Sequence, residues 1–325
     1  MGLLYFCPMA NDFLIRFLGT GSAIPTPGRH PTAQWLTIGE RHYLIDCGEG
    51  TQMQIRKYHL PMQRLSAVFI SHMHADHFLG LPGLLSTLDL LDFRKPLTLV
   101  APEAVFMFLD DYCKITGNLF RFPIHRITTD AIRQADLIYE DKSCSVTAFA
   151  LHHSVDCHGF LFKEQPKPLK IKRKSITEFS LSHLEIQQLK AGIPVPRLQD
   201  VPGDWLTLAP APPRAYAFMT DTRPLFKWAD LMIGADVLYH EATFTQSWKD
   251  RAEQTGHSTA EAAARFAAAA KVKKLFLGHF SSRYHDLTPF LEEATPFFSE
   301  TTLASDGLEI SISAGSSDQT PDGFF

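Results

Sequence analysis

The fold of this chain is decided by a stretch of six residues, His72-Met73-His74-Ala75-Asp76-His77. The stretch follows the apolar run 67–70, which predicts a buried strand, so the cluster falls at a strand end, where α/β sheets usually hold their sites. Because side chains at positions i and i+2 of an extended segment point the same way, His72 and His74 can bind one metal ion. Asp76 and His77 follow after a turn and can face a second ion. Imidazole and carboxylate ligands suit zinc, with manganese or iron possible, whereas the alternative interpretation is a solvated His-rich surface loop.

The composition is that of an ordinary globular protein, with 325 residues, 45% of them apolar and 20% charged. This length fits one large α/β domain or two modest ones. The net charge of -4 gives no indication of a nucleic-acid binder, although it leaves room for a local basic patch. The five cysteines form no Cys-x-x-Cys pair and leave one over, which favours a reducing compartment. Since the sequence shows no secretory signal and no apolar run of membrane-spanning length, we expect a soluble, cytoplasmic protein.

Strands and helices are expected to alternate along most of the chain, after hairpin-like strands at its start. This alternation predicts sheets sandwiched between helices. The expected strands are residues 14–18, 34–38, 42–45, 67–70, 97–100, 145–150, 159–162, 215–219, 237–239 and 275–277. The expected helices include residues 52–58, 84–91, 104–115 and an Ala-rich helix that ends at residue 270.

A site for two metal ions needs more ligands than the histidine cluster holds. Three later residues fit because each follows an expected strand: His153, Asp221 and His279. Any one of them alone would more often be structural, but together they complete a binuclear centre in which Asp221 bridges both ions. The two expected ligand groups are His72, His74 and His153 for the first ion, and Asp76, His77 and His279 for the second.

One segment breaks the pattern, because residues 163–174 hold six basic side chains and one acidic one. Two prolines in the segment discourage a helix and predict an extended, exposed course. Such a charge run is usually a solvated face or a linker. It is also what binding to a phosphate backbone would need.

Several motifs beyond the cluster give the chain a resemblance to a known family. The chain carries an Asp motif, then His-x-His-x-Asp-His, and then His, Asp and His motifs. This order resembles the metallo-β-lactamase superfamily. The later motifs narrow the resemblance to ribonuclease Z, the endonuclease family that processes tRNA 3′ ends. The matching stretches are Phe17-Leu18-Gly19-Thr20-Gly21-Ser22, Leu44-Ile45-Asp46-Cys47-Gly48-Glu49-Gly50-Thr51-Gln52, Asp221-Thr222-Arg223-Pro224, His240-Glu241-Ala242-Thr243-Phe244, His257-Ser258-Thr259 and Gly278-His279-Phe280-Ser281-Ser282-Arg283-Tyr284.

The resemblance implies an α/β fold, the metallo-β-lactamase αβ/βα four-layer sandwich with a protruding arm. The catalytic domain would span residues 13–315, with an inserted tRNA-binding arm at 163–205 and a flexible tail at 316–325. The implied activity is that of a zinc-dependent endoribonuclease that cleaves the 3′ trailer from precursor tRNA, leaving a 3′-hydroxyl on the tRNA and a 5′-phosphate on the trailer. We expect two zinc ions per chain, precursor tRNA as partner, a homodimer and no membrane association.

Within this resemblance, a zinc-bound hydroxide would attack the scissile phosphorus. Asp76 would bind the second ion and also orient or deprotonate the hydroxide. His257 would give the departing 3′-oxygen its proton, with Glu241 keeping it charged. His257 precedes residues 258–261, which predict a capping box at the start of the Ala-rich helix, and a helix start also favours phosphate. The plainer interpretation makes His257 and Glu241 a loop residue and a strand-end residue.

Further residues have supporting roles in this hypothesis. Asp46 ends a strand and would orient a ligating histidine, although it fits a turn-capping role nearly as well. Arg283 and Ser281 follow His279 and would hold a substrate phosphate. In the arm, the basic residues expected to contact tRNA are Lys170, Lys172, Arg173 and Lys174.

The sequence departs from the family pattern near the site. Ala75 and Thr220 stand where glycine is usual, and the loop 25–30, which helps the family to treat a 3′-CCA end, lacks the usual Arg-Asn pair. The alternative function is a metallo-β-lactamase-fold phosphodiesterase or other hydrolase acting on a small substrate, which would not need the basic segment. A non-catalytic metal-binding scaffold is a third candidate, but such a scaffold has no use for a proton donor such as His257.

Overall fold

The computed structural model describes residues 12–313, which divide into two compact units. The larger unit comprises residues 12–163 and 215–312, and the smaller comprises residues 164–214. The tail expected at residues 316–325 lies outside the described residues.

Within the described part of the chain, the larger unit holds two seven-stranded sheets. The strands of the first sheet, in spatial order, are β18 (Glu309–Ser311), β1 (Phe13–Gly19), β3 (Ala33–Ile38), β4 (Arg41–Ile45), β5 (Leu65–Phe69), β6 (Leu97–Ala101) and β7 (Ile124–Thr128). Those of the second are β17 (Thr301–Leu303), β15 (Lys274–Gly278), β14 (Val237–Glu241), β13 (Ala215–Met219), β10 (His158–Glu164), β9 (Cys144–Ala150) and β8 (Ala135–Glu140). A short parallel pair, β2 (Gly21–Ser22) and β16 (Phe280–Ser281), joins distant parts of the chain.

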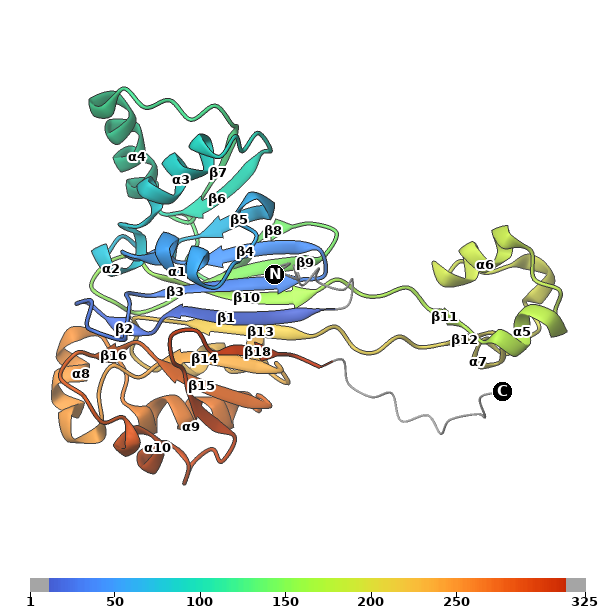
Figure 1. Ribbon diagram of the computed structural model, residues 1–325. Coiled ribbons are helices and arrows are strands. Elements are labelled where there is room, and N and C mark those ends of the chain that lie inside the picture. The colour runs from blue at the N-terminus through green and yellow to red at the C-terminus, as the bar shows by residue number, and fades with distance from the viewer. Residues whose placement is uncertain (1–11, 314–325) are drawn as a thin grey trace, which may run out of the picture. The chain divides into compact units, whose positions relative to one another are not determined.

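Helices cover the outer face of each sheet (Figure 1). On the first sheet lie α1 (Thr51–Lys57), α3 (Leu81–Leu90) and α4 (Glu103–Thr116), and on the second lie η3 (Phe226–Trp228), η4 (Asp230–Met232), α9 (Ala260–Ala270) and α10 (Thr288–Ala294). The shorter elements η1 (Met62–Arg64), α2 (Ala75–Phe78), η5 (Gln246–Trp248) and α8 (Lys249–Thr255) complete the unit. None of the described helices has the length and apolar character that crossing a membrane requires.

The main core lies between the two sheets and is rich in aromatic residues. Phe69 of β5 packs against Phe160 and Phe162 of β10, with ring centroids 5.5 and 5.1 Å apart. Phe17 of β1 stacks on Tyr239 of β14 at 5.8 Å. Each sheet therefore buries one face against the other sheet and its opposite face against helices, which confirms the predicted α/β four-layer sandwich.

The expected strands and helices are all present, with ends shifted by a few residues. Elements with a weak apolar pattern escaped prediction, such as β7 and β8, whose residues are all partly or fully exposed. One helix start was predicted wrongly: Thr259, not Ser258, caps α9, and its side chain accepts a hydrogen bond from the Ala262 amide. The Ser258 hydroxyl instead donates to the carbonyl of Thr222 at 2.7 Å.

The smaller unit has a core of its own, formed by Leu181, Leu189, Val195, Leu198 and Leu206. A buried ion pair between Glu164 and Arg214, with an N–O distance of 2.7 Å, joins its two ends. Its elements are β11 (Lys170–Ile171), α5 (Arg173–Glu178), α6 (His183–Lys190), η2 (Pro196–Leu198), α7 (Gly203–Leu206) and β12 (Thr207–Leu208).

The extended course expected for residues 163–174 is wrong at its end, because Arg173 and Lys174 form the first turn of α5. The two prolines precede β11, so they do not oppose a helix that begins after it. Lys170, Arg173 and Lys174 are exposed and Lys172 is partly exposed.

Candidate metal centre and active site

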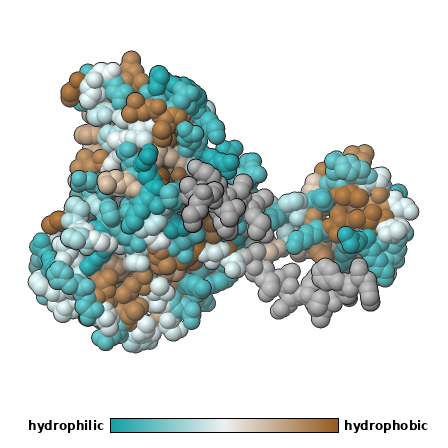
Figure 2. All heavy atoms as spheres, in the orientation of Figure 1, coloured by the Kyte–Doolittle hydropathy of each residue, from teal (hydrophilic) through white to brown (hydrophobic). Residues whose placement is uncertain are grey.

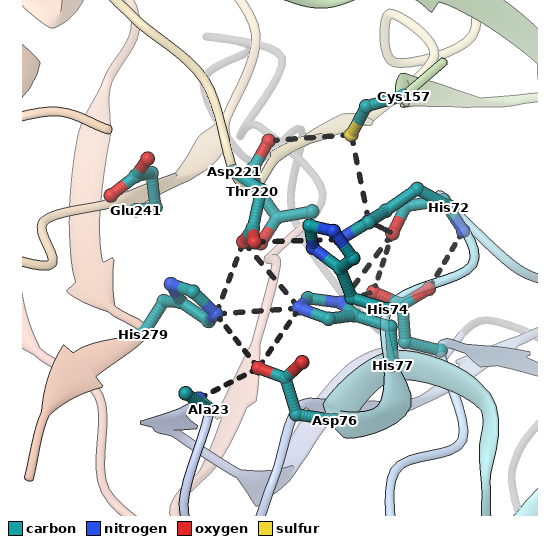
Figure 3. A network of polar contacts seen from close by, with 12 residues as sticks. Ala23, His72, His74, Asp76, His77, Cys157, Thr220, Asp221, Glu241 and His279 are labelled. Atoms are coloured by element: carbon teal, nitrogen blue, oxygen red, sulfur yellow. Dashed lines mark hydrogen bonds and ion pairs between the residues drawn. The ribbon is translucent and has the colours of Figure 1, made fainter. Parts of the chain in front are cut away.

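The candidate site gathers side chains that follow four strands of the larger unit. His72 comes three residues after β5, His153 three residues after β9, Asp221 two residues after β13 and His279 directly after β15. The structure brings all seven predicted ligands together in two groups, within which the candidate ligand atoms lie no more than 4.8 Å apart. Figure 3 shows most of these side chains pointing toward a common centre.

The first group consists of His72, His74, His153 and Asp221. The Nε2 atom of His153 lies 3.2 Å from Nδ1 of His74. The Oδ2 atom of Asp221 lies 3.4 Å from Nε2 of His72 and 3.6 Å from Nε2 of His153. Three imidazole nitrogens thus converge near one carboxylate oxygen.

The second group consists of Asp76, His77 and His279. The Nε2 atoms of His77 and His279 are 3.3 Å apart, and each lies 3.5 Å from Oδ2 of Asp76. The other carboxylate oxygen of Asp221, Oδ1, lies 3.4 Å from Nε2 of His77 and 3.0 Å from that of His279. Asp221 therefore presents one oxygen to each group, as a bridging ligand would.

Hydrogen bonds behind His72 and His77 determine which ring nitrogen faces the centre. The buried carboxylate of Asp46 accepts a hydrogen bond from Nδ1 of His77 at 2.7 Å. It also accepts the amide and hydroxyl protons of Ser71, at 2.7 and 2.9 Å. Because the Ser71 hydroxyl proton is used in this way, its oxygen accepts from Nδ1 of His72 at 3.0 Å. Both rings are thus held with Nε2 toward the centre.

His153 and His279 are held in the same way. Nδ1 of His153 donates to the carbonyl of Gly256 at 3.2 Å. Nδ1 of His279 donates to the Thr243 hydroxyl at 2.9 Å, and that hydroxyl donates to the carboxylate of Glu241 at 2.7 Å. Thr243 was not among the predicted site residues, although its place two residues after Glu241 in the same motif was a usable signal.

This donor set fits a metal cation. The Nε2 atoms of His77 and His279 lie 3.3 Å apart, and a carboxylate oxygen of Asp76 and one of Asp221 lie within 3.5 Å of both. Among the described residues, the buried Nε2 of His72 has no hydrogen-bond partner. A buried polar atom without a partner costs free energy, and a cation bound by these nitrogens would remove that cost. Neutral imidazoles with carboxylates are ligands that transition-metal ions prefer.

Three site residues adopt left-handed backbone conformations that are rare for side-chain-bearing residues. The φ angles are 55° for Asp46, 39° for Asp221 and 58° for His279. Such conformations are unfavourable and persist where surrounding contacts fix them. At Asp221 and His279 they turn the side chain toward the centre just after a strand ends, and at Asp46 they direct it to Nδ1 of His77.

His257 and Glu241 form a pair next to the candidate metal ligands. Nδ1 of His257 lies 2.9 Å from Oε1 of the fully buried Glu241. Burial alone would lower the pKa of His257, but the Glu241 carboxylate raises it to about 9. Glu241 also accepts hydrogen bonds from the amides of Thr222 and Thr243, at 2.9 and 3.0 Å. His257 is therefore protonated at neutral pH and has Nε2 free to donate.

A cavity of about 460 Å³ opens onto the site. His74, Asp76, His153, Asp221 and His257 line it. Two further lining residues, Ser22 and Arg223, lie in matching motifs but had no predicted role. The remaining ones lie outside every matching motif: Ala23, His152, Ser154, Gln254, Thr255 and Gly256. The Ala23 amide donates to Oδ2 of Asp76 at 2.7 Å, which ties the loop after β2 to the metal ligands.

The predicted substrate-binding residues lie outside the cavity that the candidate ligands line. Arg283 is exposed, and its Nε donates to the Ser281 hydroxyl at 3.0 Å. Neither residue lines the main cavity. The predicted tRNA-binding residues belong to the smaller unit and not to the larger unit that holds the site: Lys170, Lys172, Arg173 and Lys174.

The chain is similar over nearly its whole length to curated proteins named Ribonuclease Z. The relative from Parabacteroides distasonis is 38% identical over 307 residues, which cover 93% of this chain and 99% of the relative. The relative from Cytophaga hutchinsonii is 40% identical over 308 residues, which cover 93% of this chain and 97% of the relative. In addition, residues 13–116 match a family model described as Anti-Pycsar protein Apyc1.

Solved structures agree with these relatives. The short form of human tRNase Z is 28% identical, with a TM-score of 0.68, and the similarity covers 92% of this chain and 99% of that one. The metallo-β-lactamase fold protein YhfI from Bacillus subtilis has a TM-score of 0.66 at 17% identity, covering 92% of this chain and 99% of that one. This second similarity concerns the fold alone.

Proposed function

The chain belongs to the ribonuclease Z family, and from this premise we propose that it is an endoribonuclease that cleaves the 3′ trailer from precursor tRNA. The tRNA would keep a 3′-hydroxyl and the trailer a 5′-phosphate. The observation that carries the proposal is the pair of donor groups joined by Asp221, beside a protonated His257. Such a pair of groups is typical of centres that hydrolyse phosphodiesters.

We assign two zinc ions to these groups. His72, His74 and His153 would hold one, Asp76, His77 and His279 the other, and Asp221 would contact both. When bound, the ions supply a nucleophile at neutral pH and neutralise charge on the phosphoryl oxygens. Asp46 and Thr243 orient the ligating rings, because each accepts a hydrogen bond from the Nδ1 atom of one of them.

Two side chains would carry the protons of the reaction. Asp76 faces the cavity and accepts a hydrogen bond from the attacking water, which orients it toward phosphorus. His257 gives its Nε2 proton to the departing 3′-oxygen, and the Glu241 carboxylate stabilises the charged ring beforehand. The bond between phosphorus and the 3′-oxygen breaks, and the tRNA leaves with a 3′-hydroxyl.

The smaller unit is the tRNA-binding arm of this proposal. Four of the five residues from 170 to 174 are basic, so they can contact successive phosphates: Lys170, Lys172, Arg173 and Lys174. The capping box of Ser182 and Glu185, together with the Glu185–Arg197 pair, keeps this small unit ordered.

A homodimer is part of the proposal. Leu90, Met107, Ile115 and Leu119 are between 63% and 84% exposed. They lie on neighbouring elements, because Asn118 donates a hydrogen bond to Ser86 of α3. Figure 2 shows hydrophobic residues over this region, at the top of the view. An apolar surface of this kind suits the same surface of a second copy.

We place the enzyme in the cytoplasm, with its substrate. The described cysteines, Cys47, Cys113, Cys144 and Cys157, are all free thiols, as expected for reducing surroundings.

The proposal is tested by giving the purified protein precursor tRNA and bis-p-nitrophenyl phosphate side by side. A ribonuclease Z releases the trailer with high kcat/KM and cleaves the small diester slowly. Preference for the small diester, with precursor tRNA left intact, would favour a small-substrate hydrolase on the same fold.

A further inference from the structure

A cluster of exposed aromatic and basic side chains lies outside the site described above. The Arg283 guanidinium sits 4.3 Å from the ring centroid of Trp248 and 5.0 Å from that of Phe244. Phe244 is buried, whereas the Trp248 side chain is 45% exposed. An exposed aromatic ring with an arginine stacked on it is typical of surfaces that bind single-stranded nucleic acid.

The cluster adjoins the proton donor. The Phe244 ring centroid lies 6.1 Å from that of His257. Arg283 is bonded to Ser281 of β16, and Ser281 pairs in register with Ser22 of β2, which lines the cavity. These links place the Arg283–Trp248 pair close to the rim of the active-site cavity.

The cluster is also held rigidly before any substrate arrives. The backbone of η5, which ends at Trp248, is fixed because the Gln246 amide donates to the Glu293 carboxylate at 2.8 Å. The Thr245 amide donates to the hydroxyl of Tyr284, next to Arg283 in the sequence, at 3.1 Å. A platform fixed in advance loses little conformational entropy when a ligand binds.

We propose that Trp248 and Arg283 form a nucleobase-binding subsite, in which the exposed indole face stacks on an unpaired base next to the scissile phosphodiester. The Arg283 guanidinium lies over one face of the ring, so the base would stack on the opposite face and the guanidinium would bind the adjoining phosphate. This inference rests on the proposed function, since the cleaved end of a precursor tRNA is single-stranded there and offers its base faces. Stacking tolerates any base, so the subsite would position the strand without fixing its sequence.

The test compares Trp248→Ala and Trp248→Phe with the wild type on precursor tRNA. We expect kcat/KM to fall roughly 5- to 150-fold for Trp248→Ala, the usual effect of losing one stacked base, and to recover largely in Trp248→Phe. Hydrolysis of bis-p-nitrophenyl phosphate, which has no nucleobase, should change less than twofold. The matched control is Phe297→Ala, because Phe297 is also a partly exposed ring beneath an arginine, Arg265 at 3.8 Å.

Two abasic precursors then identify the stacked base, one lacking the base on the 5′ side of the scissile bond and one lacking that on the 3′ side. Trp248→Ala should add no further loss on one of them. Additive losses on both precursors, unchanged cleavage of intact precursor, or equal loss on the small diester would each overturn the subsite. If the wild type itself leaves precursor tRNA intact, the proposed function fails, and the subsite with it.

Discussion

Replacing His257 with alanine tests the proton donor of the proposed reaction. His257 lies beside the metal ligands but has Glu241, not a ligand, as its close partner at 2.9 Å. At pH 7 the ring is almost wholly protonated, because its pKa is about 9. Without this proton, the departing 3′-oxygen must leave as a poorly stabilised alkoxide. We expect kcat on precursor tRNA to fall about 10²–10⁴-fold, which corresponds to roughly 2.7–5.4 kcal/mol of barrier.

The leaving group separates proton donation from other roles of His257. Nitrophenolate needs no proton to depart, so hydrolysis of bis-p-nitrophenyl phosphate by His257→Ala should fall much less than cleavage of tRNA. Elemental analysis should find the same metal content as in the wild type. His125→Ala is the matched control, because His125 is an exposed histidine of β7 outside the site. Equal losses on both substrates would refute proton donation, and loss of a metal ion would make His257 a ligand, since it also lies near Asp221 and His279.

Three further variants test other parts of the structure. His74→Ala removes one nitrogen from the first ligand group and should abolish activity and lower the bound metal measured by elemental analysis; unchanged metal content would contradict the assignment. Alanine at Lys170, Lys172, Arg173 and Lys174 together should weaken precursor-tRNA binding and reduce the slope of log K against log salt by up to about 3–4, at roughly 0.9 per lost phosphate contact, with the small diester unaffected. Phe69→Ala should lower the free energy of unfolding by about 3–5 kcal/mol in urea titrations, because Phe69 is fully buried between the sheets; a change below about 1 kcal/mol would contradict this burial, because loss of the buried ring alone costs more.

The convergence of the candidate metal ligands could be predicted because these residues follow apolar strands. The run 67–70 marks its strand by composition alone, and the spacing of His72 and His74 then directs both side chains to one side. The same logic located His153, Asp221 and His279, each within three residues of a strand end. Local sequence pattern was sufficient here because these strands are mostly buried and strongly apolar.

Other features depend on contacts that no local pattern records. The left-handed conformations of Asp221 and His279 arise at residues other than glycine, the residue that usually signals them. Ser258 and Thr259 are equally good helix caps by type, and the carbonyl of Thr222, 36 residues away, engages the Ser258 hydroxyl. The core of the smaller unit holds only five buried apolar residues, too few to give its helices a clear periodic pattern.

The contacts of Glu241 affect how variants at the site are interpreted. One of its oxygens contacts His257 directly, and the other reaches His279 through the Thr243 hydroxyl. A single buried carboxylate therefore stabilises the charged ring of the proposed proton donor and also orients the ring of a candidate metal ligand. Substitution of Glu241 would disturb both functions together, and its effect cannot be divided between them because residues that act as a unit are not additive. His257→Ala leaves the Glu241–Thr243–His279 chain in place, so proton donation can be measured on its own only at His257.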